Sequence, residues 1–112
     1  KDFTNNEIDQ SVLLVDIEGA EFDLFDRNLF KKFSKSIIYI ELHPFIFKDD
    51  GHEKLQKLES DAKEYFTIKK ITTTSRDLSE FKELEEWDDT DRWLICSEGR
   101  PNLMTWWRLD PL

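Results

Sequence analysis

The sequence of 112 residues has little of what builds disulfide scaffolds, glycine-rich loops or membrane spans. It contains one cysteine, three prolines and three glycines, and no two of the glycines are close in the sequence. Because Cys96 has no partner within the chain, a disulfide framework is excluded and a reducing, cytoplasmic compartment is expected. No apolar run approaches the roughly 20 residues that span a bilayer, and no signal-peptide pattern opens the chain.

Positive charge is scarce as well. Lysine and arginine number 16 against 25 aspartates and glutamates, for a net charge of -9. Such a chain repels phosphate backbones and acidic membranes, so we expect neither a nucleic acid nor a membrane as a partner. Apolar residues make up 38% of the chain and gather in short runs, and aromatic residues reach 13%. This pattern predicts a folded domain despite the high charge content.

Two short apolar runs, residues 11–15 and 37–42, have the composition of strands that are buried on both faces. The second run ends at Pro44, which cannot donate a ladder hydrogen bond. The apolar residues between the runs recur at the spacing of one amphipathic helix: Phe22, Phe25, Leu29 and Phe33. Two strands joined by a helix form a right-handed β-α-β unit, so the sequence predicts an open α/β sheet.

The rest of the chain is expected to alternate in the same way. Residues 1–10 read as a loop or a frayed lead-in, and a helix is predicted to begin at Asp49 or Asp50. Mixed polarity over residues 67–74 indicates a strand at the edge of the sheet. Residues 77–87 show a weak helical period, residues 93–96 are predicted as the last strand, and the remainder as a tail carrying Met104, Trp106 and Trp107. Residues 1–112 are therefore interpreted as one domain or half-domain.

The first strand, residues 12–15, raises the question of what covers it. It is apolar, yet the crossover supplies a neighbour on one side only, and an apolar edge strand invites pairing with another chain. We expect either an upstream segment or a second copy of the chain at this edge. The predicted partners are thus a missing half-domain or a homodimer formed through residues 12–15.

Polar side chains gather where the two predicted strands end. Ligands bind at the ends of parallel strands in open α/β sheets, because the loops diverge there. Gly19 lies where the chain must turn from strand into helix. An alternative is that Asp16 and Glu18 only cap the helix and complement its dipole. The polar residues at the two ends are Asp16, Glu18 and Glu21 after the first strand, and Glu41 and His43 at the second.

These two segments together resemble a known family. Residues 15–21 read VDIEGAE after an apolar strand, and residues 40–44 read IELHP about twenty residues later. The chain is similar in these motifs to the FkbM-type S-adenosylmethionine-dependent methyltransferases, in which the fourth strand ends in a K-I-D-V-E-G-A-E-like segment and the fifth in an E-I-H-P-like one. The resemblance rests on two linked motifs in the expected order and spacing, over residues 11–44.

The resemblance implies a Rossmann-like methyltransferase sheet, mostly parallel with an antiparallel last strand, that uses S-adenosylmethionine to methylate an oxygen of a small-molecule hydroxyl acceptor. The acceptor hydroxyl must then be deprotonated or polarised, in line with the transferred methyl group. His43 is the best candidate for the base, with Asp16 orienting it or the substrate. By position in the family, the catalytic residues would be Asp16, Glu18 and His43, the cofactor would lie at Asp16 and Gly19, and the substrate at Glu21 and Glu41.

The sequence departs from the family in the elements that bind the cofactor. It lacks the glycine-rich loop after the first strand of the sheet and the acidic residue after the second. By the family's anatomy the chain corresponds to the carboxyl-terminal half of the fold, which predicts that it is inactive without the other half. The alternative is a non-catalytic α/β module that associates with itself or with a partner.

Other side chains allow weaker hypotheses. Asp16, Glu18, Glu41 and His43 could together ligate a divalent metal, as in a metal-dependent hydrolase, but no pair of histidines has ligand spacing, and we expect no metal. Cys96 is predicted to be an inert thiol inside a strand. The tail tryptophans could form an aromatic platform, although packing of their indoles on the sheet is the commoner arrangement.

Overall fold

The computed structural model describes residues 3–74, 77–97 and 102–112. It divides into two compact units. Residues 1–71 and 104–112 form the first, which we call the sheet unit, and residues 72–103 form the second, the acidic unit. Among the described residues, no helix is long and apolar enough to cross a membrane.

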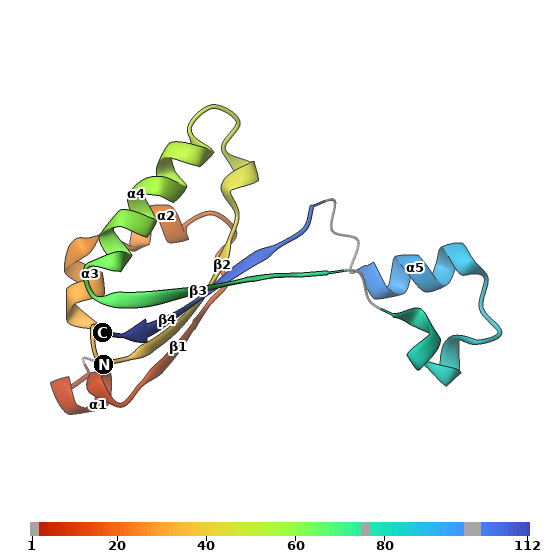
Figure 1. Cartoon of the computed structure of the whole chain (residues 1–112), viewed down its shortest axis with the longest axis horizontal. Helices are drawn as coiled ribbons and strands as arrows, with labels where there is room; N and C mark the ends of the chain where they lie inside the picture. The colour runs from red at the N-terminus through yellow and green to blue at the C-terminus, as the bar shows by residue number, and fades with distance from the viewer. Residues whose placement is uncertain (1–2, 75–76, 98–101) are drawn as a thin grey trace. The chain divides into compact units, whose positions relative to one another are not determined.

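A four-stranded mixed sheet forms the centre of the sheet unit, in the order β1-β2-β4-β3 (Figure 1). β1 pairs with β2 in parallel, and β2 pairs with β4 in antiparallel. At the far side, the backbone N–H of Leu112 donates to the carbonyl of Tyr65, which joins the end of β4 to the beginning of β3. The strands are β1 (Val12–Val15), β2 (Ile37–Leu42), β3 (Phe66–Thr72) and β4 (Thr105–Pro111).

The sheet is mixed, with one parallel and one antiparallel pair described, so the expectation of a mostly parallel sheet is not supported. The last strand is antiparallel to β2, as the resemblance implies, and it lies inside the sheet. β4 lies between β2 and β3, so these two strands do not pair directly. The predicted edge position of the strand over residues 67–74 is confirmed, since β3 ends the sheet order.

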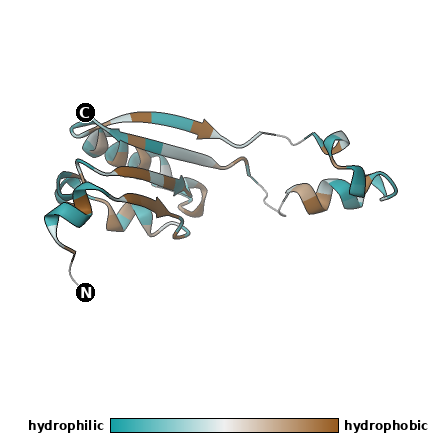
Figure 2. Cartoon of the chain, turned by 90° about the horizontal axis from the view of Figure 1, so that it is seen from below, coloured by the Kyte–Doolittle hydropathy of each residue, from teal (hydrophilic) through white to brown (hydrophobic). Residues whose placement is uncertain are grey.

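The helices α2 (Glu21–Leu24), α3 (Arg27–Lys32) and α4 (Gly51–Lys63) lie on the same face of the sheet (Figures 1 and 2). The one helix expected over Phe22 to Phe33 is divided in two, because Phe25 has an extended backbone with ψ of 116°. The side chain of Asp26 then accepts a hydrogen bond from the N–H of Leu29 and caps a new helix.

The core lies between this helical layer and the sheet. Phe25 and Phe30 stack with ring centroids 5.2 Å apart, and Phe30 meets Phe66 edge-on. Apolar burial of this kind is the main source of folding free energy. The buried cluster consists of Val15, Phe25, Phe30, Ile38, Ile40, Leu42, Leu58, Ala62, Phe66, Trp107 and Leu109.

Two terminal segments differ from the sequence prediction. The expected loop over residues 1–10 contains a short helix, α1 (Asn5–Asp9), which Thr4 and Glu7 close with a reciprocal capping box. The expected tail after residue 103 is β4, in which Trp107 is fully buried. Packing of an indole in the sheet unit, the commoner arrangement for the tail tryptophans, is therefore confirmed for Trp107.

The predicted last strand over residues 93–96 is wrong, because these residues belong to a helix in the acidic unit. An apolar run of four residues is too short to show a period, so a helix and a strand look alike in it. Cys96 is consequently half-buried in a helix and not inside a strand. The described elements of the unit are two 3-10 turns, η2 (Leu78–Glu80) and η3 (Lys82–Leu84), and α5 (Asp89–Ser97).

β1 is not buried on both faces. Val15 packs in the core, whereas the side chains of Val12 and Leu14 are 65% and 73% exposed. The reason is that among the described residues no helix covers this second face of the sheet, and β1 ends the strand order (Figure 2). The open edge expected from the sequence is confirmed, while the identity of a partner there stays a prediction.

Candidate functional site

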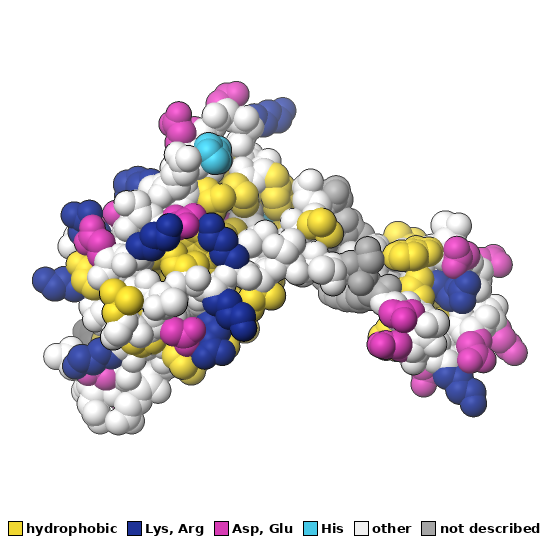
Figure 3. Space-filling view, in the orientation of Figure 1, with side chains coloured by type: hydrophobic (Ala, Val, Ile, Leu, Met, Phe, Trp, Pro, Cys, Tyr) yellow, Lys and Arg dark blue, Asp and Glu magenta, His cyan; other side chains and the backbone are white. Residues whose placement is uncertain are grey.

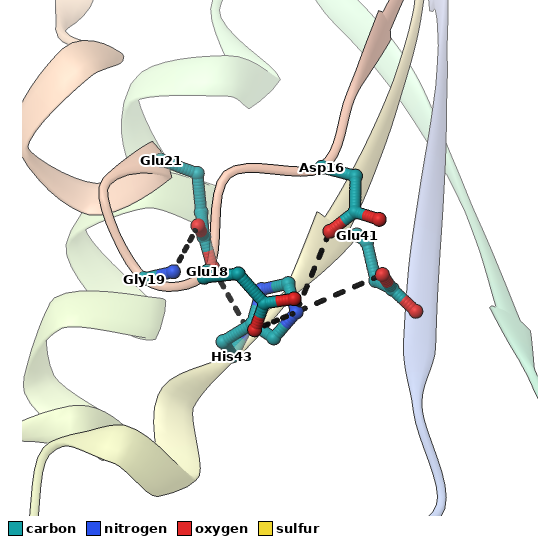
Figure 4. Close-up of polar contacts among 6 residues, drawn as sticks. All are labelled: Asp16, Glu18, Gly19, Glu21, Glu41 and His43. Atoms are coloured by element: carbon teal, nitrogen blue, oxygen red, sulfur yellow. Dashed lines mark hydrogen bonds and ion pairs between the residues drawn. The ribbon is translucent and has the colours of Figure 1, made fainter. Parts of the chain in front are cut away.

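The polar ends of β1 and β2 converge on one imidazole, that of His43 (Figure 4). His43 directly follows β2, and Pro44 ends the strand by beginning a 3-10 turn, η1 (Pro44–Ile46). The side chain of His43 is only 1% exposed. Parallel pairing of β1 and β2 brings the residues that follow β1 to the same edge.

One side of the imidazole is held by Glu21, the first residue of α2. Its Oε1 accepts a hydrogen bond from the backbone N–H of His43 at 2.7 Å and lies 3.1 Å from His43 Nδ1. Its Oε2 accepts from the backbone N–H of Gly19 at 2.8 Å. Glu21, which the resemblance places at the substrate, is fully buried. It contacts three groups at once: the backbone N–H of Gly19, the backbone N–H of His43 and Nδ1 of His43.

The other side of the imidazole faces carboxylates. Its Nε2 lies 3.7 Å from Asp16 Oδ1, 3.5 Å from Glu18 Oε2 and 3.6 Å from Glu41 Oε2. Among the described residues, none forms a hydrogen bond with this buried nitrogen. Glu41 is as buried as His43, whereas the side chains of Asp16 and Glu18 are 43% and 76% exposed. The exposed pair opens the cluster to solvent.

The turn between β1 and α2 has an unusual backbone. Glu18 and Gly19 both have positive φ, at 53° and 99°. Glycine adopts this conformation without steric cost, whereas glutamate adopts it at a steric cost because it has a Cβ. A Cβ on Gly19 would also lie 3.2 Å from Ile46 Cδ1, so the turn packs closely against η1. Together these features direct the carboxylate of Glu18 toward His43 and the N–H of Gly19 toward Glu21.

The hydrogen bonds determine which nitrogen of His43 carries a proton. A carboxylate only accepts, so the contact with Glu21 requires a proton on Nδ1. In a neutral imidazole the lone pair then lies on Nε2, which faces three carboxylates. Lone pairs and negative charges repel one another, so a cation beside Nε2 relieves repulsion within the cluster. One oxygen each of Asp16 and Glu41 and one nitrogen of His43 lie within 4.8 Å of one another, a grouping that could hold a metal ion.

All six residues that the sequence analysis singled out lie together in this cluster, which we call the His43 cluster: Asp16, Glu18, Gly19, Glu21, Glu41 and His43. The sequence analysis missed the aromatic segment that follows. The ring of Phe45 meets that of His43 edge-on, with centroids 5.9 Å apart, and the side chain of Phe47 approaches Gly19. The only signal was three large apolar residues directly after Pro44, in a segment with no helical or strand period.

Comparison with known proteins gives one positive result. The family model described as the methyltransferase FkbM domain matches residues 1–94. Neither the curated proteins nor the solved structures contain a match to this chain. The matched region includes the whole His43 cluster, the strands β1 to β3 and the beginning of α5, and it ends before β4.

Proposed function

This chain belongs to the family of FkbM methyltransferase domains, and on that premise we propose that the His43 cluster takes part in methyl transfer from S-adenosylmethionine to a hydroxyl oxygen of a small-molecule acceptor. The observation that carries the proposal is the buried Nε2 of His43, which faces the solvent-exposed carboxylates of Asp16 and Glu18. A site of this kind can take a proton from a hydroxyl group that enters between the carboxylates.

The proposed role of each side chain follows from its contacts. S-adenosylmethionine, when bound, supplies an electrophilic methyl group on a positively charged sulfur. With no other cation in the cluster, His43 Nε2 would accept the proton of the acceptor hydroxyl while the hydroxyl oxygen bonds to the methyl carbon and the sulfur–methyl bond breaks, which leaves the cofactor as a neutral thioether. Glu21 stabilises the imidazolium through Nδ1, and Asp16 orients the hydroxyl.

The charge of the cluster fits the cofactor only in part. Exposed carboxylates at Asp16 and Glu18 suit a nearby sulfonium. The described residues include no glycine-rich turn for the amino-acid portion of the cofactor. We therefore propose that a further protein segment supplies the remaining cofactor contacts, and that this chain acts as the carboxyl-terminal half of the fold. The antiparallel β4 and the uncovered β1 support this arrangement.

Isotope-labelled methyl transfer tests the proposal. Labelled S-adenosylmethionine and a panel of hydroxyl compounds are incubated with these 112 residues alone and with the polypeptide that carries them. We expect His43→Gln to lower the rate by about 10²–10⁴-fold, as for loss of a general base. His52→Gln, at the other histidine, which is exposed on α4, is the matched control and should keep the rate. Full activity of His43→Gln would contradict the role of His43.

A titration with S-adenosylmethionine tests the half-domain separately. We expect no tight binding by the 112 residues alone and tight binding by a polypeptide that also contains a glycine-rich strand-turn-helix. Tight binding by the isolated chain would overturn the half-domain proposal and leave the methyl transfer proposal standing.

A second candidate function is self-association without catalysis. It is favoured by the exposed side chains of Val12 and Leu14 on the open strand β1. Two copies of the chain could pair β1 with β1 through this edge, so that each copy covers the exposed apolar side chains of the other.

A further inference from the structure

The structure assigns a divalent transition-metal site to the His43 cluster, with His43 Nε2, Asp16 and Glu41 as ligands and the exposed carboxylate of Glu18 as a further oxygen donor. This proposal goes beyond the proposed function, because binding of a metal ion is a separate property that can be measured without any methyl transfer. No two histidines of the sequence have ligand spacing, and only the arrangement of side chains in space brings the ligand atoms together.

The distances around Nε2 suit ligands that share an ion. At 3.5–3.7 Å the three carboxylate oxygens are too far from the nitrogen for good hydrogen bonds, which need about 2.7–3.2 Å. Two ligand atoms that are each about 2.1 Å from one ion, at a tetrahedral angle, are separated by about 3.4 Å. Nε2 and each of the three oxygens therefore already stand at nearly the separation that coordination requires, and the ligand atoms of Asp16, Glu41 and His43 all lie within 4.8 Å of one another.

The position of Glu21 supplies the support that a metal-binding imidazole needs. Histidine ligands generally donate their other N–H to a carboxylate, which fixes the tautomer and makes the ligating nitrogen more basic. Glu21 Oε1 holds Nδ1 of His43 in this way at 3.1 Å, and Gly19 and the backbone of His43 hold Glu21. Nε2 thus faces an oxygen of Asp16 and an oxygen of Glu41 (Figure 4).

Burial makes this point a ligand site and not a solvated acidic surface. Nε2 is buried and has no hydrogen-bond partner among the described residues, an arrangement that is costly unless something else contacts it. Several carboxylates gather around it in a chain of net charge -9, so a cation relieves both the unsatisfied nitrogen and the repulsion between carboxylates.

The donor set limits the identity of the ion. Ca²⁺ and Mg²⁺ prefer oxygen ligands alone, and a thiolate-dominated site would favour softer ions. One imidazole with two or three carboxylates suits Mn²⁺, Fe²⁺, Co²⁺ or Zn²⁺. Co²⁺ is a practical probe because its visible absorption reports ligand type and coordination number.

Occupancy would change the chemistry proposed for His43, and this consequence rests on the proposed function. An ion on Nε2 takes the lone pair that would otherwise receive the hydroxyl proton. An acceptor hydroxyl bound to the ion loses its proton more readily, since a divalent cation lowers the pKa of a bound hydroxyl. The proton then leaves to solvent through the exposed side of the cluster, near Glu18.

The test is a Co²⁺ titration of the full 112-residue chain, followed by calorimetry and by visible absorption. We expect one equivalent to bind and Asp16→Asn to weaken binding at least tenfold, with a changed spectrum. His43→Gln should abolish the imidazole contribution to the spectrum. Matched controls are His52→Gln at the other histidine and Asp89→Asn in the acidic unit, both at exposed residues, which should bind Co²⁺ like the unchanged chain.

Folding and binding effects are separated by the choice of variant. His43 is buried and its replacement could unfold the chain, whereas the side chain of Asp16 is 43% exposed, and circular dichroism verifies that Asp16→Asn keeps its fold. Absence of one-equivalent binding at millimolar Co²⁺, or binding unchanged in Asp16→Asn, would overturn the metal site. Methyl transfer that persists in a strong chelator would leave the proposed function intact, so the two proposals fail separately.

Discussion

Glu18 adopts a left-handed backbone conformation with φ of 53°, next to Gly19 at 99°. A non-glycine residue there carries a steric cost, because its Cβ crowds the following carbonyl. No hydrogen bond or core packing of the 76% exposed Glu18 side chain compensates for this cost among the contacts described, and its carboxylate points at His43. Strain of this kind at a polar cluster is typical of functional sites.

Glu18→Gly and Glu18→Ala together measure this strain, since both remove the carboxylate and only glycine accepts positive φ freely. We expect the glycine variant to be more stable than the alanine variant by about 1 kcal/mol in urea unfolding. Both should lose Co²⁺ affinity to the same extent. Equal stability of the two variants would mean that the turn adjusts to a residue with a Cβ, and would contradict the claim that the positive φ at position 18 carries a steric cost.

At the scale of elements, α4 is joined to the sheet by charged as well as apolar contacts. Glu59 of α4 pairs with Lys63 one turn later at 2.7 Å and with Lys70 of β3 at 2.9 Å. Hydrogen bonds from Lys63 and Lys70 hold the pKa of the Glu59 carboxyl below its ordinary value of 4.5. The folded state therefore binds the proton less tightly than the unfolded state does.

This depressed pKa predicts a pH-dependent effect of Glu59→Gln. The stabilisation is fully present above the unfolded pKa of 4.5 and is lost as the pH falls through the lower folded pKa. At pH 7 we expect the variant to be less stable by up to about 1 kcal/mol, since the pairs are largely solvated. Urea unfolding should show this difference in stability narrowing toward about pH 3, and Glu53→Gln, at an exposed glutamate of the same helix, is measured alongside as the matched control. A stability difference between the unchanged chain and Glu59→Gln that is constant with pH would contradict the lowered pKa of Glu59.

The elements that the sequence predicted well are those with a clear period or a clear end. β2 ends before Pro44 and α4 begins after Asp50, as expected. The failures have local causes. Phe25 divides a helix whose apolar spacing is continuous, and a four-residue run at 93–96 fits either period. The stretch before β4 carries no strand signal strong enough to distinguish a strand from a packed tail.

At the scale of the whole molecule, β1 and β3 are the two edge strands of the sheet unit. β1 ends the strand order, and its outward side chains Val12 and Leu14 are exposed. The acidic unit is a separate compact body, and Figure 3 shows acidic side chains over its visible face. Its charge opposes association with acidic partners, whereas the open β1 offers exposed apolar side chains on an edge strand.

Leu14→Lys tests whether β1 mediates self-association. We expect the unchanged 112-residue chain to form dimers at micromolar concentration and Leu14→Lys to shift it to monomers, because a lysine on an edge strand opposes pairing. Leu94→Lys, at a comparably exposed leucine of α5, is the matched control and should leave the dimer intact. Light scattering distinguishes these states. A stable monomer of the unchanged chain would exclude self-association through β1.

The sequence by itself determined the α/β alternation, the two strand-end motifs and the family, because strand composition, helical spacing and motif order are local properties of the chain. It also identified every residue of the His43 cluster, since all of them lie at or shortly after the end of a strand. Only the tertiary structure decided that Glu21 is buried behind the imidazole, that Nε2 faces three carboxylates, and that β4 inserts beside β2. These depend on distances between segments about 20 to 70 residues apart, which only packing of the folded chain sets.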